Sequence, residues 1–179
     1  MIDSVLGVVS VAMFYKFDKK ERRELYGLAG EYRTPKHGLE YRTLSNAWLQ
    51  HPVLANICFE LARAAVTLVN EEIEDVWNGV PESEVIRIIQ ENDYVAARKV
   101  VRANKGFLQA IVGMCLMVND DKKTKDKNMV YYIALNGAHR YLGENPSIEK
   151  AWDLEGGWKS HCDGFGKNIR LASQAFAKS

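Results

Sequence analysis

The fold is decided by residues 52–77, which read PVLANICFELARAAVTLVNEEIEDVW. Apolar residues recur in this stretch at spacings of three, four and five, the pattern of a helix with one apolar face. Pro52 suits the first turn of such a helix, where no backbone N–H is needed. Asn78 and Gly79 follow, and a glycine just beyond the last periodic residue typically ends a helix. The stretch therefore predicts one long core helix, whose apolar stripe is Leu54, Ile57, Leu61, Ala65, Leu68, Ile73 and Val76.

The chain before this helix predicts further helical segments. Residues 2–32 combine valines with a charged second half and predict a helix, with a short strand ending at Phe17 as the alternative. The run TPKHG at 34–38 ends this segment, because proline and glycine both interrupt helices. Residues 39–49 predict a short helix that leads to Pro52.

The chain after the core helix predicts several more helices. Pro81 begins one, with acidic residues in its first turn where the helix dipole favours them. Asn92 and Asp93 are suited to cap the next one. Residues 104–118 are apolar nearly all round, as in a helix central to a core or an interface. Further helices are predicted over 129–142, 146–154 and 167–177.

These segments together predict an all-α fold. About seven helices with short links form a single compact bundle, since the sequence holds no convincing set of strands. The domain organisation that we expect is an N-terminal apolar and charged segment with a linker, residues 1–38, followed by the helical bundle, residues 39–179.

The composition is that of an ordinary globular protein. Hydrophobic residues make up 47% and charged residues 26% of the 179 positions, which excludes disordered and low-complexity chains. The formal net charge of +1 gives no global field that attracts nucleic acid, so nucleic acid is not an expected partner. Three cysteines, Cys58, Cys115 and Cys162, do not form a disulfide framework. We therefore expect a reducing compartment such as the cytoplasm.

An uncharged stretch at residues 4–15 raises the question of a membrane contact. Twelve helical residues span about 18 Å, whereas the hydrocarbon core of a bilayer is about 30 Å thick. The stretch is too short to cross a bilayer unaided, so we expect a buried core segment. The alternative is peripheral membrane association through Val5, Val9 and Phe14.

The most unusual composition lies at residues 156–168, GGWKSHCDGFGKN. A phosphate-binding loop of the form GxxxxGK[ST] fails here, because His161 and Asn168 stand at two of its four required positions. A second interpretation is an anion site in which Gly164 and Gly166 expose backbone N–H groups beside Lys167. Otherwise the segment only turns the chain toward its last helix.

The histidines and cysteines predict neither a metal site nor a cofactor. The sequence has no CxxC, HxxxH or HExxH spacing. The adjacent pair His161 and Cys162 is poor evidence for a nucleophile and its base, because neighbouring side chains point in different directions. His51 is placed to cap the core helix, and His139 is expected near the end of the helix over 129–142.

Glu60 is the weak candidate for a catalytic residue. It stands inside the apolar core helix with Arg63 three residues further on. A buried acid there could act as a general acid, with Glu144 or Glu155 as a distant partner, as in a glycoside hydrolase. The alternative is an exposed ion pair with Arg63 on the polar side of the helix.

Two charged patches of opposite sign are the candidate surfaces for a protein partner. Acidic residues between positions 70 and 86 include Glu71 and Glu74, with no basic residue among them. The basic patch follows shortly after, where one helix face can carry several cations. Its residues are Arg98, Lys99, Arg102 and Lys105.

These observations favour a non-enzymatic helical protein that binds other proteins. Such a module could be an assembly subunit, an adaptor or an inhibitor, and proteins of this type are frequent in phages and mobile elements. It could also form a homo-oligomer through residues 107–118 and the charged patches. The alternatives are a carboxylate-dependent hydrolase and a peripheral membrane protein.

Overall fold

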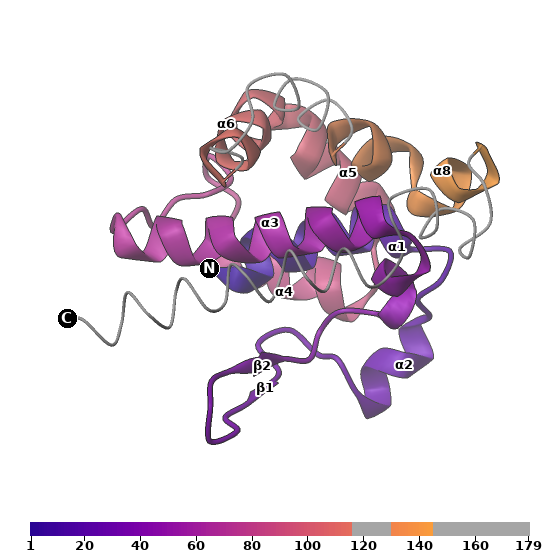
Figure 1. Ribbon diagram of the computed structural model, residues 1–179, viewed down its shortest axis with the longest axis horizontal. Coiled ribbons are helices and arrows are strands. Elements are labelled where there is room, and N and C mark those ends of the chain that lie inside the picture. Colours follow the sequence, from indigo (N-terminus) through magenta and orange to yellow (C-terminus); the bar gives the residue numbers. More distant parts are fainter. Residues whose placement is uncertain (116–129, 145–179) are drawn as a thin grey trace.

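The computed structural model describes residues 1–115 and 130–144, with the backbone alone described for 111–115 (Figure 1). More than half of the described residues are helical, and the strands among them are only two residues long each. The all-α fold predicted from the sequence is therefore confirmed.

Helix α3, Pro52–Asn70, is the core helix predicted from the sequence (Figure 1). The Nδ1 atom of His51 caps it by accepting the backbone N–H of Val53 at 3.1 Å, as predicted. The prediction that the helix continues to residue 77 is wrong. Asn70 is its last residue, and the chain then turns through Glu72 at a φ of +56°.

The loop after α3 still contributes to the core. Val76 and Trp77 are only 5% and 2% exposed, and the indole Nε1 of Trp77 donates a hydrogen bond to the Ser4 carbonyl at 2.8 Å. These residues are buried because they are hydrophobic, although they lie in a loop. Their apolar character therefore continued the helical pattern of α3 in the sequence beyond the end of the helix.

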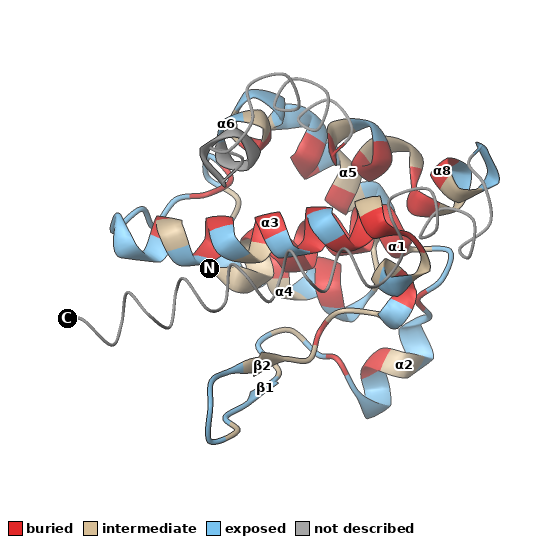
Figure 2. Cartoon of the chain, viewed as in Figure 1, coloured by how far each residue is buried: buried red, intermediate tan, exposed pale blue. Residues whose placement is uncertain are grey.

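The N-terminal segment lies inside the molecule. A short π-helix η1, Asp3–Gly7, and helix α1, Val8–Phe14, contact α3, α4 and α5 and form the buried centre in Figure 2. Val5 and Val9 are 0% exposed and Phe14 is 1% exposed. These side chains are core residues and are not available to a membrane. They belong to the same core cluster as those of α3 to α5. The division expected at residue 38 stays a prediction.

The predicted helix over residues 2–32 is interrupted after Phe14. A turn leads to helix α2, Lys20–Leu25, and the chain then forms a hairpin of β1, Tyr32–Arg33, and β2, Glu40–Tyr41, in which Tyr32 faces Tyr41. Residues 39–49 therefore form no α-helix, and only the 3₁₀-helix η2, Asn46–Gln50, follows the hairpin.

A buried charge network follows the end of α1 and holds this region together. Asp18 is 5% exposed and Arg23 is 2% exposed, and they pair at 2.7 Å. Arg22 adds two hydrogen bonds to the Asp18 carboxylate, and both arginines donate to the Thr43 carbonyl at 2.8 Å. Since buried charges need partners, this set fixes where α2 and the hairpin meet the core.

The second half of the described chain follows the sequence more closely. Helix α4 is Glu82–Gln90, α5 is Tyr94–Ala103 and α6 is Lys105–Cys115, and Asp93 caps α5 by accepting the Ala96 N–H at 3.0 Å. The helix predicted over 129–142 is instead divided. Residues 130–136 are helical, Gly137 breaks the helix at a φ of +90°, and α8, Ala138–Glu144, follows.

Helix α3 is long and apolar enough to cross a membrane by length and composition alone. Buried residues make up 56% of its most apolar window, and the helix forms the centre of the fold. Its apolarity is thereby explained by the core.

The core position of α1 has a measurable consequence. Val9→Thr keeps the side-chain shape but buries a hydroxyl where valine is 0% exposed, so we expect the free energy of unfolding to fall by about 1–3 kcal/mol. The matched control is Val95→Thr, because Val95 is 62% exposed and its change should stay within about 0.5 kcal/mol. Urea unfolding measures both, and equal effects would contradict the core assignment.

Candidate functional site

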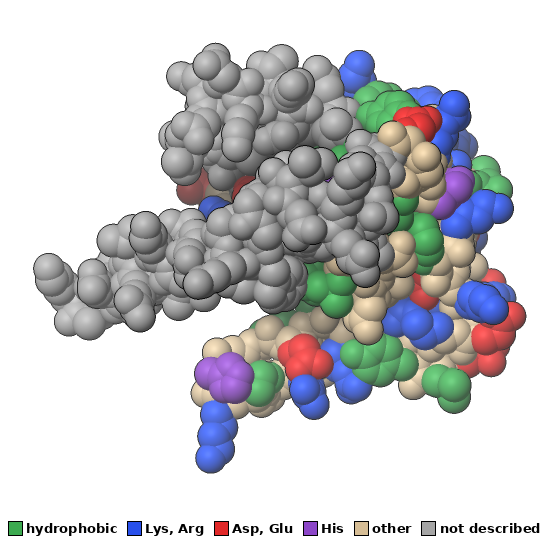
Figure 3. All heavy atoms as spheres, turned by 45° about the vertical axis from the view of Figure 1, so that its right-hand side comes forward, with side chains coloured by type: hydrophobic (Ala, Val, Ile, Leu, Met, Phe, Trp, Pro, Cys, Tyr) green, Lys and Arg blue, Asp and Glu red, His purple; other side chains and the backbone are tan. Residues whose placement is uncertain are grey.

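Aromatic and basic side chains gather where the end of α1, helix α5 and helix α8 meet. The three segments are distant in sequence, and α1 contacts both α5 and α8. In the space-filling view, blue and purple side chains lie beside green ones on the right-hand side, where α8 comes forward (Figure 3). We call this group the cationic aromatic cluster; its members are Tyr15, Lys16, Tyr94, Arg98, His139 and Arg140.

Ring stacking forms the base of the cluster. Tyr15 and Tyr94 stack with ring centroids 4.1 Å apart, and the His139 ring meets Tyr15 edge-on at 5.3 Å. The Cζ atom of Arg98 lies 4.5 Å from the Tyr15 centroid and 5.2 Å from that of Tyr94. Lys16 Nζ lies 5.5 Å from the Tyr15 centroid. These distances are within the range of cation–π attraction.

Gly137 explains why His139 reaches this position. Its φ of +90° turns the chain sharply between the two helical segments. A Cβ atom at Gly137 would lie 2.7 Å from the His139 ring and 2.9 Å from Cε1 of Tyr15. Only glycine therefore allows the backbone to approach both rings this closely.

Several nitrogen atoms of the cluster are buried without a hydrogen-bond partner. They are Nε and Nη2 of Arg98 and Nδ1 of His139, which bond to nothing among the residues the structure describes. A buried N–H that lacks an acceptor costs about 1–3 kcal/mol. An anion that reached these groups would remove part of this cost, and a guanidinium binds carboxylate or phosphate with two parallel bonds.

The electrostatic environment of the cluster is positive. Burial, and then the charges of Lys16, Arg98 and Arg140, lower the pKa of His139 below its ordinary value of 6.5. Arg140 pairs with Glu144 at 3.3 Å. The cluster therefore combines an imidazole that is neutral at neutral pH with an excess of fixed cations, an arrangement that can hold an anion and accept a proton.

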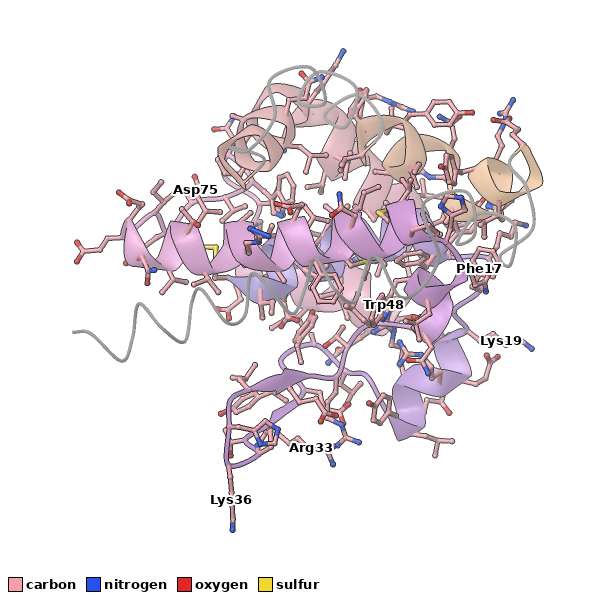
Figure 4. All side chains as sticks on the ribbon, in the orientation of Figure 1. Phe17, Lys19, Arg33, Lys36, Trp48 and Asp75 are labelled. Atoms are coloured by element: carbon pink, nitrogen blue, oxygen red, sulfur yellow. The ribbon has the colours of Figure 1, made fainter. Side chains whose placement is uncertain are left out.

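The lowered pKa of His139 can be measured directly. An NMR titration of its ring proton should give a midpoint below 6.5, and Lys16→Gln should move that midpoint upward, since it removes a neighbouring positive charge. Because protonation is disfavoured only in the folded state, the protein should also lose stability as the pH falls from 6.5 toward the folded-state pKa. Lys36→Gln is the matched control, since Lys36 lies at the hairpin tip (Figure 4). A midpoint at or above 6.5 contradicts this assignment.

The four residues of the predicted basic patch do not share one environment. Arg98 belongs to the cationic aromatic cluster, and Lys105 lies over the Tyr131 ring, with Nζ 5.0 Å from the centroid. Arg102 is exposed one turn beyond Arg98. Lys99 instead lines a hollow beside Trp77. A role for Lys99 and Arg98 in binding one protein partner stays a prediction.

The predicted acidic patch is exposed at the far end of α3. Glu71 and Glu74 are both exposed in the loop that follows this helix. Figure 4 places the neighbouring Asp75 at that end of α3, opposite to Phe17. The acidic patch therefore lies far from the cationic aromatic cluster, and a role for it in partner binding stays a prediction.

Glu60 is buried, contrary to the expectation of an exposed ion pair. It is 7% exposed, and its Oε1 lies 3.5 Å from Nη2 of Arg63, so the predicted pairing is present. Glu144, its suggested catalytic partner, instead pairs with Arg140 and accepts the Tyr132 hydroxyl. The structure does not bring the two acids together as a hydrolytic pair, and Glu155 lies outside the described residues.

The remaining predicted sites form no second functional site within the described residues. Gly164, Gly166, Lys167, His161 and Cys162 lie outside it. Cys58 is buried in the core, and this burial raises the pKa of its thiol to about 12. No group of three metal-ligating side chains is found within residues 1–115 and 130–144.

Sequence reasoning missed the tyrosines and His139 as parts of a site. Tyr15 resembled the end of an apolar stretch, and Tyr94 resembled the first residue of a helix. The available signal was the basic residue beside or one turn from each aromatic residue, as in Tyr15-Lys16, Tyr94-Arg98 and His139-Arg140. Only the packing of α1, α5 and α8 shows that these pairs meet.

Comparison with known proteins decides the class of this chain. The model of the family described as Phage phiEco32-like COOH.NH2 ligase-type 2 matches residues 1–154. The chain belongs to this family. Searches of curated proteins and of solved structures find no match. The family's description contains the name of a phage, which does not establish the source of this chain.

Membership in a ligase family corrects the function predicted from the sequence. The prediction of a non-enzymatic assembly subunit, adaptor or inhibitor is wrong, because the family is one of enzymes. Membership in the ligase family also replaces the two alternatives, a carboxylate-dependent hydrolase and a peripheral membrane protein. Nothing in the structure supports the predicted homo-oligomer. The sequence analysis interpreted the basic residues as a surface for a protein partner, because their spacing matches no known catalytic motif.

Proposed function

We propose that this protein takes part in forming an amide bond between the carboxyl group of one substrate and the amine of another, with the cationic aromatic cluster holding the carboxyl substrate. The family description supports the reaction class. The Nε and Nη2 atoms of Arg98, which have no hydrogen-bond partner among residues 1–115 and 130–144, support the location. They lie beside Lys16 and His139, where positive charge is in excess.

Amide formation from a carboxylate requires activation, because the carboxylate resists attack by an amine. A nucleoside triphosphate can transfer its terminal phosphoryl group to a carboxylate oxygen, which gives an acyl phosphate and a nucleoside diphosphate.

The second step matches the chemistry of the cluster. The amine nitrogen attacks the carbonyl carbon, the C–N bond forms, the C–O bond to phosphate breaks, and the nitrogen loses a proton. His139 is suited to accept that proton, because its lowered pKa keeps the imidazole neutral. Arg98 and Lys16 stabilise the negative charge on the oxygens of the acyl phosphate and of the departing phosphate.

Anion binding at Arg98 can be tested without knowing the substrate. Phosphonoacetate is a suitable probe, since it carries a carboxylate and a phosphonate on one small molecule. Calorimetry should show binding to the wild type that Arg98→Gln weakens about 10-fold or more, the loss expected for charge-assisted hydrogen bonds. Arg33→Gln on the hairpin (Figure 4) is the matched control. Equal affinities of the two variants would contradict the proposed location.

A further inference from the structure

A hollow lies on another side of α5, away from the cationic aromatic cluster. Its volume is about 310 Å³, the lower end of the range for small-molecule sites. Apolar walls come from Trp77, Val80, Ala96, Val100 and Ala103.

The rim of the hollow carries charges of opposite sign. Lys99 and Glu84 both line it and interact electrostatically. Lys99 is exposed and forms no ion pair with any residue in the described part of the chain. The hollow therefore offers a cation and an acid beside an apolar surface.

The acidic side of the rim is held by Arg87 and keeps spare acceptor capacity. Arg87 binds both Glu84 oxygens at 2.8 Å and also contacts Asp93 at 2.9 Å. Two carboxylates thus share one guanidinium, which leaves a net negative charge. A carboxylate has about four lone-pair positions, so Glu84 can accept further N–H donors while Arg87 holds it in place.

The hollow and the cluster use different faces of α5. A helix has about 3.6 residues per turn, so Tyr94 and Arg98 share one face, whereas Ala96 and Ala103 point to another side. The buried residues Ala97 and Val101 pack between these two sides. The hollow is therefore separate from the centre at which amide formation is proposed.

We propose that this hollow is a second binding site for a small zwitterion, an α-amino acid with an aliphatic side chain. Lys99 binds the α-carboxylate, Glu84 binds the α-ammonium group, and the walls around Trp77 take up the apolar side chain. A free amino acid satisfies all three features at once, whereas a simple amine or a simple carboxylate satisfies only two.

The test compares three probes that carry the same isopropyl side chain. L-Valine carries both charges, isobutylamine lacks the carboxylate, and isovalerate lacks the ammonium group. NMR titrations should show saturable shifts of the Trp77 indole and Gly79 amide signals with L-valine. We expect at least about 10-fold weaker binding of the other two probes, since each loses one charge-assisted contact.

Variants of the rim residues assign the contacts. Lys99→Gln should weaken the binding of L-valine at least about 10-fold and leave the affinity for isobutylamine unchanged. Glu84→Gln should weaken the binding of L-valine and leave the affinity for isovalerate unchanged. Lys36→Gln on the hairpin (Figure 4) should change nothing. Absence of saturable shifts with L-valine, or equal binding of all three probes, would overturn the site.

This proposal and the proposed function can fail separately. Arg98→Gln should leave L-valine binding intact, and Lys99→Gln should leave phosphonoacetate binding intact, because the two sites share no residue. If Arg98→Gln abolishes L-valine binding while the protein stays folded, the amino acid binds at the cluster and the second site is refuted.

Discussion

Replacing Asp18 with Asn is expected to lower the free energy of unfolding by about 3–5 kcal/mol. Among the described residues, Asp18 is the only carboxylate that pairs with the buried guanidinium of Arg23. Oδ2 of Asp18 lies 2.7 Å from Nη2 of Arg23, and both side chains are at most 3% exposed. The change leaves a positive charge in the interior without its counter-charge, and that is costly in a medium that solvates ions poorly.

Two further variants separate this effect from a general loss of ion pairs. Lys20→Gln removes a pair with Glu91 whose side chains are about half exposed, and it should cost at most about 1 kcal/mol. Adding Arg23→Met to Asp18→Asn should recover part of the lost stability, because it removes the uncompensated charge. If urea unfolding gives Asp18→Asn and Lys20→Gln the same small cost, the network does not hold α2 and the hairpin as described.

The second large effect is on catalysis. Arg98→Gln should lower kcat/KM for amide formation about 100-fold or more, a loss typical of removing a charged group that stabilises the transition state. Arg98→Lys keeps the charge but loses the planar guanidinium that can donate two parallel hydrogen bonds. Its activity should therefore lie between that of Arg98→Gln and that of the wild type. Arg33→Gln is the matched control, since Arg33 pairs with Glu40 on the exposed hairpin.

The kinetic pattern distinguishes binding from a structural role. If Arg98 holds the carboxyl substrate, its replacement should raise KM for that substrate and leave KM for the amine unchanged. The far-ultraviolet circular dichroism should match that of the wild type, because position 98 lies within α5 and glutamine is also a good helix former. Equal changes in both KM values together with a lower Tm would mean that Arg98 supports the packing of Tyr15 and Tyr94 instead.

Periodicity predicted the helices well where one face of each helix meets the core. Helices α3, α4 and α5 begin where Pro52, Pro81 and Asp93 indicated, because capping is a local property of the chain. Helix ends and breaks were predicted less well. The turn after Phe14 leads to Asp18, which pairs with Arg22 and Arg23, and both arginines donate to the Thr43 carbonyl. Such long-range contacts leave no periodic signal.

The candidate site was predicted only through Arg98. Sequence spacing grouped this residue with Lys99, Arg102 and Lys105, since all four stand close together in the chain. The structure instead groups it with Tyr15 and His139, which are distant in sequence. Chemistry at a site depends on such tertiary contacts, so charge counting could not separate a binding site from a solvated face.

The central claim is that this chain joins carboxyl and amino groups at the cationic aromatic cluster, and a hydroxamate assay tests it most directly. The full chain is mixed with a panel of carboxylic acids, a nucleoside triphosphate, Mg²⁺ and hydroxylamine, an amine that converts an activated carboxyl group into a coloured hydroxamate. We predict hydroxamate formation with at least one acid, strongly reduced by Arg98→Gln and retained by Arg33→Gln. Hydroxamate levels equal to those of heat-inactivated protein throughout the panel, or equal activity of Arg98→Gln and the wild type, would contradict the account.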